Sequence, residues 1–174
     1  GNLQGRSKFL REIITSIREE TGPEFLIAVR ISPIIEKIGI YLEDSLILAN
    51  MLSKMEIDMI HISCWDVFQE VDDEDKSKSL TKRFREVIPS NVPLISTGAV
   101  WNAQDAQYVL DEGADLVGVA RVGIAHPDWP MYIGDISYSP QRPPFSEQHL
   151  LNVDLSPTFV DYMRGWKNFV IGGK

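Results

Sequence analysis

The sequence predicts an α/β protein built on a parallel β-sheet. Three observations support this fold class. Four apolar runs alternate with amphipathic segments over the first 120 residues. The runs are continuously apolar and rich in β-branched residues, as strands are when both faces of a sheet are covered. The intervening segments repeat their apolar residues with helical spacing and are long enough to connect parallel strands.

The first two units follow from apolar spacing and from residues that end helices. A helix is expected over 6–21, where an apolar stripe stops at Gly22-Pro23. The run "FLIAVRIS", residues 25–32, is expected to be a buried strand. Glu43 places negative charge in the first turn of a helix expected over 43–55, and "DMIHIS", residues 58–63, is the next strand.

The next two units repeat this order. A helix is expected over 79–88, ended by Pro89, and "VPLIST", residues 92–97, is the third strand. A helix is expected over 102–112, ended by Gly113, and "ADLVGVA", residues 114–120, is the fourth strand. Four such units are about half of an eight-unit barrel of the TIM type, which usually needs about 250 residues. An open doubly wound sheet is the competing architecture, although no G-x-G-x-x-G follows a strand.

Two regions are predicted along the chain. Residues 1–130 form the half-barrel, and residues 131–174 form a C-terminal extension in which the regular alternation stops. In this extension Ser156 and Pro157 suit the start of a terminal helix over 155–166, which we expect to pack on the barrel.

The composition excludes several classes of binding site and indicates a cellular compartment. The net charge is -8, with 25 acidic and 17 basic residues, which argues against a general nucleic-acid or membrane surface. A single cysteine, Cys64, excludes an intrachain disulfide and a cysteine metal cluster, and we expect no metal site. With no apparent signal peptide or membrane span, a cytoplasmic setting is expected. The chain begins with Gly1, as a processed product or a fragment does.

Arg30 is the first candidate site residue. Alternation along its strand places Ala28, Arg30 and Ser32 on one face. If the aliphatic residues between them meet the outer helices, Arg30 points into the barrel near its C-terminal mouth, where barrel active sites are built. The alternative is an internal ion pair with a carboxylate.

The ends of the last two strands are the second candidate site. The segments "STGAV" and "VAR" place Gly98 and Arg121 where loops of barrels often bind phosphate. The alternative is ordinary turn chemistry at Gly98 and surface exposure at Arg121. His61 is interpreted as a wall histidine, Cys64 as a packing residue, and the acidic run 72–75 as a solvated loop without the pattern of a calcium site.

The segments together resemble the Old Yellow Enzyme-type NADH:flavin oxidoreductases. "GNLQGRSKFLREIITSIREETGP" is similar to that family's G-G-S-x-E-N-R-x-R-F segment, and "VRIS" to its arginine strand. "PLISTGAV" is similar to P-V-I-x-x-G-G-I, and "ADLVGVARVGIAHPDWP" to A-D-x-V-x-x-G-R-x-x-x-x-D-P-x-x-P. The resemblance covers roughly residues 1–130.

This resemblance implies a barrel that binds flavin mononucleotide (FMN), is reduced by NADH or NADPH, and reduces activated alkenes. Arg30 would contact the N1 and O2 edge of the flavin, where reduction places negative charge. Gly98, Ala99, Ala120 and Arg121 would bind its phosphate. The sequence departs from the family at Ala99 and Ala120, where the family has glycines, and at 64–65, where "CW" replaces glycines.

The family's substrate residues lie on its first four strands, so no catalytic residue is assigned here. We expect an enzyme that is incomplete in this chain, acting on a small-molecule substrate. An exposed half-barrel is expected to pair with a second copy or with the missing N-terminal half. The alternative is a non-catalytic half-barrel assembly or binding module. An aldolase-like enzyme would need a Schiff-base lysine, and the four expected strands contain none.

Overall fold

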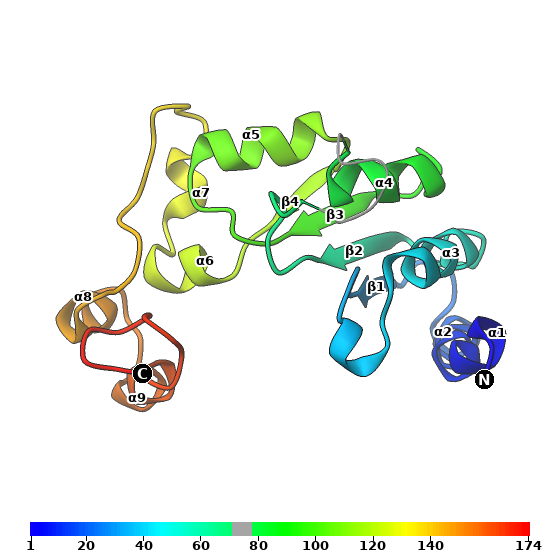
Figure 1. Ribbon diagram of the computed structural model, residues 1–174, viewed down its shortest axis with the longest axis horizontal. Helices are drawn as coiled ribbons and strands as arrows, with labels where there is room; N and C mark the ends of the chain where they lie inside the picture. The colour runs from blue at the N-terminus through cyan, green and yellow to red at the C-terminus, as the bar shows by residue number, and fades with distance from the viewer. Residues whose placement is uncertain (71–77) are drawn as a thin grey trace. The chain divides into compact units, whose positions relative to one another are not determined.

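Four parallel strands form a single sheet in the computed structural model, which describes residues 1–70 and 78–174. The strands are β1 (Ala28–Ile31), β2 (Met59–Ser63), β3 (Leu94–Thr97) and β4 (Leu116–Gly118). Their spatial order is β1-β2-β3-β4, so each strand pairs with its neighbour in sequence (Figure 1). A doubly wound sheet reverses its strand order at a switch point, whereas a barrel does not. The predicted half-barrel of four strand–helix units is therefore confirmed. The acidic run 72–75 lies outside the described residues.

The predicted helices are present in the predicted order with shorter bounds, together with short helical segments that were not predicted. The chain forms α1 (Leu3–Arg6), α2 (Lys8–Thr21), η1 (Glu36–Ile38), α3 (Leu42–Leu52), α4 (Leu80–Val87), α5 (Ala103–Asp111), α6 (Arg121–Ala125), α7 (Trp129–Tyr132), α8 (Glu147–Asn152) and α9 (Pro157–Met163). The helix expected over 6–21 corresponds to α2, which begins at Lys8. The short α1 precedes it, and the backbone N–H of Ser7 between them bonds to the carbonyl of Leu3. No helix among the described residues is both long and apolar enough to cross a membrane.

The sheet has one buried and one open face. Val29 pairs with Ile60, and Ile60 pairs with Leu94; these three side chains are 5%, 0% and 0% exposed. Helices α2, α3 and α4 lie along this side of the sheet (Figure 1). The alternate residues Ala28 and Arg30 are exposed, as the predicted alternation requires. The open face is the one that would line the interior of a complete barrel.

The described chain divides into two compact units. The first, the sheet unit, comprises Gly1–Ala99 and Tyr108–Gly118, and the second, the C-terminal unit, comprises Val100–Gln107 and Val119–Lys174. The core of the C-terminal unit is aromatic, with Trp101, Trp129 and Phe145 at most 6% exposed. The expected terminal helix is present as α9, where Ser156 Oγ accepts from the Phe159 N–H at 3.2 Å. The predicted division at residue 130 into a half-barrel and a C-terminal extension stays a prediction, as does the packing of the terminal helix on the barrel.

Candidate functional site

Arg30 lies on the open face of the sheet, at the pairing position opposite His61. Its side chain donates a hydrogen bond to Ser63 Oγ at 2.5 Å. Among the described residues, no carboxylate forms an ion pair with Arg30, so the alternative of an internal ion pair finds no support there. The guanidinium has five N–H donors, and the single bond to Ser63 leaves most of them available to a ligand.

His61 and Thr97 form a second polar pair on the same face. His61 Nε2 and Thr97 Oγ1 are 2.6 Å apart. Burial lowers the pKa of His61 below 6.5, and the positive charge of Arg30 lowers it further. The ring is therefore neutral at pH 7, and the interpretation as a wall histidine with a satisfied partner agrees with this geometry.

Gly118 allows this pair to form. A Cβ at position 118 would lie 1.7 Å from Thr97 Oγ1 and 3.3 Å from His61 Nε2. Only a residue without a side chain leaves room for the hydroxyl group of Thr97 beside β4. Gly118, Ser63 and Thr97 were not predicted as site residues. Period-two alternation could have placed them on one face, but their contacts depend on strand register.

The turn after β3 holds the predicted phosphate residues Gly98 and Ala99. Gly98 has φ 150°, and a Cβ there would lie 2.6 Å from the backbone oxygen of Cys64. Its carbonyl accepts from the Val67 N–H at 3.2 Å. Ala99 has φ 55°, in the left-handed region that favours glycine. This conformation explains physically why a glycine suits the position that Ala99 occupies.

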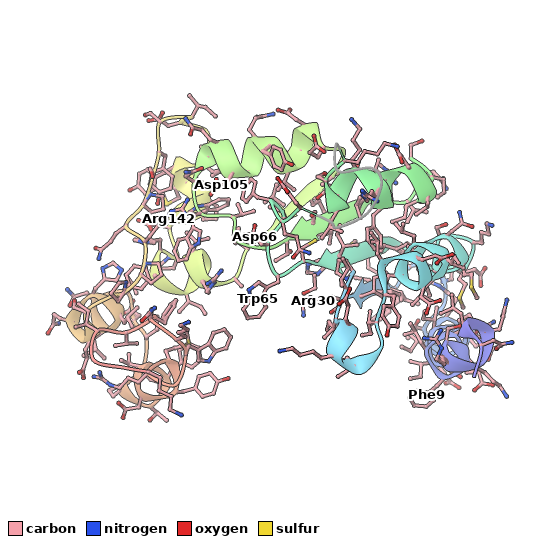
Figure 2. All side chains as sticks on the ribbon, in the orientation of Figure 1. Phe9, Arg30, Trp65, Asp66, Asp105 and Arg142 are labelled. Carbon is pink, nitrogen blue, oxygen red and sulfur yellow. The ribbon has the colours of Figure 1, made fainter. Side chains whose placement is uncertain are left out.

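The turn after β2 combines a buried thiol with an exposed indole. Cys64 is 7% exposed, and burial raises the pKa of its thiol to about 12. A thiol in this state is not a nucleophile near neutral pH, in agreement with its interpretation as a packing residue. The Trp65 side chain is 88% exposed. Figure 2 shows Trp65 and Arg30 on the same side of the sheet.

Ala120 and Arg121 belong to the C-terminal unit, where α6 begins. Ala120 is the exposed N-terminal flanking residue of α6, and Arg121 is its first residue. The Arg121 guanidinium carbon lies 5.8 Å from the ring centroid of Trp101. No ion pair links Arg121 to a carboxylate within residues 1–70 and 78–174. Because Gly98 and Ala99 lie in the sheet unit, the grouping of these four residues into one site stays a prediction.

The remaining histidines have structural partners. His126 Nε2 lies 2.9 Å from the carbonyl oxygen of Gln141, and His149 Nε2 lies 2.9 Å from that of Ala125. Within the part of the chain that the structure describes, no group of three or more His, Cys, Asp or Glu residues is placed to hold a metal ion.

Comparison with known proteins gives one consistent family. The model of the NADH:flavin oxidoreductase / NADH oxidase family matches residues 1–136. A protein of Klebsiella pneumoniae (strain 342) named NADH:fumarate oxidoreductase is 33% identical over 138 residues, which are 74% of this chain and 15% of that protein.

Solved structures agree with this match. An Old Yellow Enzyme homologue from Zymomonas mobilis is similar with TM-score 0.66 and 23% identity, over 90% of this chain and 45% of that one. A morphinone reductase variant in complex with tetrahydroNAD is similar with TM-score 0.58 and 26% identity, over 77% of this chain and 35% of that one. The chain thus spans less than half the length of each of these relatives. The family match and the shared barrel fold show that the chain belongs to the NADH:flavin oxidoreductase / NADH oxidase family.

Proposed function

We propose that this chain forms the FMN-binding C-terminal half of an NADH- or NADPH-dependent flavin oxidoreductase of the Old Yellow Enzyme type. The single observation that carries the proposal is the exposed, unpaired guanidinium of Arg30 among the described residues. Its guanidinium lies on the open face of the sheet, is held by Ser63, and has no carboxylate partner among the described residues. A cation held in this way stabilises negative charge on a ligand.

The charged residues suit FMN, which carries a phosphate at one end and gains negative charge on its ring when it is reduced. Arg30 and Arg121 are two guanidinium groups without carboxylate partners in the described chain. Arg30 would hold the N1 and O2 edge of the flavin ring. Arg121, the backbone of Gly98 and Ala99, and the exposed backbone of Ala120 would bind the phosphate.

FMN would supply hydride transfer between the nicotinamide and an alkene activated by a carbonyl or nitro group. The chain's own residues bind and orient the cofactor. Arg30 stabilises charge at the ring edge, and Ser63 fixes the direction of the guanidinium. His61 stays neutral and adds no second positive charge, since its pKa is lowered. We assign no catalytic residue to this chain, and the exposed Trp65 is suited to contact a small-molecule substrate.

The open face of the sheet also indicates a partner. Arg30 and Leu116 are both exposed on this face, and half of the apolar Leu116 residue is open to solvent. A barrel interior is normally filled by side chains from all its strands. We propose that a second copy or an N-terminal half-barrel covers this face in a cytoplasmic enzyme.

The test is an FMN titration followed by flavin fluorescence and absorbance. We expect the purified chain to bind FMN, and Arg30→Ala and Arg121→Ala to weaken binding at least about tenfold. Lys37→Ala, in the exposed turn η1, is the matched control and should leave binding unchanged. The proposal is refuted if FMN fails to bind both to the chain alone and to the chain mixed with the N-terminal half-barrel of a family member. That result would favour the non-catalytic half-barrel module.

A further inference from the structure

We propose that Arg142 is a second cation of the phosphate-binding site, gathered with Arg121 around the buried indole of Trp101. The inference rests on the proposed binding of FMN and adds a residue to its phosphate site. Arg142 belongs to the proline-rich segment 139–145, to which the sequence assigns no binding role.

Two guanidinium groups share one aromatic ring. The Cζ atoms of Arg121 and Arg142 lie 5.8 and 5.9 Å from the ring centroid of Trp101. Both distances lie within the range of cation–π attraction, about 6 Å. Trp101 is only 4% exposed. A buried ring with two cations around it places both charges in one region of the C-terminal unit, although like charges repel.

Asp105 holds Arg142 and Trp101 in this arrangement. Asp105 Oδ2 accepts from the backbone N–H of Trp101 at 2.8 Å and from the guanidinium of Arg142 at 3.3 Å. Figure 2 shows the Asp105 and Arg142 side chains. The Asp105 side chain is 16% exposed, whereas that of Arg142 is 55% exposed. The indole N–H of Trp129 donates to the backbone carbonyl of Trp101 at 2.8 Å, so the backbone of Trp101 is held at both its N–H and its carbonyl group. Asp105 therefore anchors Arg142 while much of its guanidinium stays open to solvent.

The charges of this cluster are not balanced. Asp105 offsets one of the two guanidinium groups, and Arg121 has no carboxylate partner within the described residues. This positive excess stands out in a chain with net charge -8. A planar carboxylate is satisfied by one guanidinium fork, whereas the three terminal oxygens of a phosphate monoester accept bonds from two. The cluster therefore fits a phosphate monoester, which FMN carries and riboflavin lacks.

Comparison of FMN with riboflavin tests this assignment. Dissociation constants for both flavins are measured with the full chain and with Arg142→Gln, Arg142→Lys, Arg121→Gln and the exposed control Lys167→Gln. We expect Arg142→Gln to weaken FMN about tenfold and to leave riboflavin unchanged. Arg142→Lys, which keeps the charge, should recover part of the FMN affinity, and Lys167→Gln should change neither flavin.

Three results would overturn the inference. Equal weakening of FMN and riboflavin by Arg142→Gln would mean that Arg142 acts only through packing. Unchanged FMN affinity in Arg142→Gln, with a loss in Arg121→Gln, would reject Arg142 and leave the proposed function intact. Failure of the unsubstituted chain to bind either flavin, alone or with an N-terminal half-barrel, would reject both proposals.

Discussion

Gly118→Ala should break the polar pair on the open face of the sheet. The added Cβ would lie 1.7 Å from Thr97 Oγ1, far inside contact distance. The hydroxyl group must then move, and the 2.6 Å hydrogen bond between Thr97 and His61 is lost. The change is confined to a position where two parallel strands approach closely.

The expected destabilisation combines three effects. Overpacking costs about 1–3 kcal/mol, and loss of the hydrogen bond costs about 1 kcal/mol. Replacement of a strand glycine by alanine regains about 0.5–1 kcal/mol of backbone entropy. We therefore expect Gly118→Ala to lower the free energy of unfolding by about 2 kcal/mol. In a Thr97→Ala background the obstructing oxygen is absent and only the 3.0 Å approach to the Cβ of residue 97 remains, so the same substitution should cost less than about 1 kcal/mol.

A double-mutant cycle measures this coupling. Urea unfolding followed by circular dichroism gives the free energy for the unsubstituted chain, Gly118→Ala, Thr97→Ala and the double variant. We expect a coupling energy of at least about 1 kcal/mol between the two positions. If Gly118→Ala costs the same in both backgrounds, within about 0.5 kcal/mol, the steric explanation is wrong.

Three further predictions concern the neighbouring groups. The pKa of His61 in the native chain lies below 6.5, so this residue binds a proton more tightly when the chain is unfolded, and the free energy of unfolding should fall as the pH drops from 6.5 through the native pKa. An NMR titration should show the lowered pKa of His61, and Arg30→Ala should raise that pKa part of the way to 6.5. Ala99→Gly should raise the free energy of urea unfolding by about 0.5–1 kcal/mol, because Ala99 has φ 55°, which glycine adopts more easily. Gly98→Ala should lower the free energy of unfolding, because the new Cβ would lie 2.6 Å from the Cys64 carbonyl oxygen. The Cys64 thiol, with a pKa of about 12, should react with a disulfide reagent at pH 8 only after unfolding, and rapid reaction of the native chain would contradict its burial.

Local patterns in the sequence were sufficient for the elements of the barrel. Continuous apolar runs marked all four strands, although only β2 and β3 have a neighbouring strand on both sides in this sheet. The strand bounds were less accurate: the run expected over 25–32 is a strand only from Ala28 to Ile31, and Phe25 and Leu26 are 54% and 68% exposed. Apolar composition reports hydrophobicity, whereas a strand needs a neighbour that completes its hydrogen bonds.

The sequence by itself determined the alternation of strands and helices, the family, and the face on which Arg30 lies, since these depend on spacing along the chain. Tertiary structure alone decided which side chains meet. The bond from Arg30 to Ser63 joins residues 33 positions apart, and that between His61 and Thr97 joins residues 36 apart. The placement of Arg121 and Arg142 around Trp101 likewise brings together three separate segments. Such contacts depend on register and packing between elements, which a periodic pattern within one element does not encode.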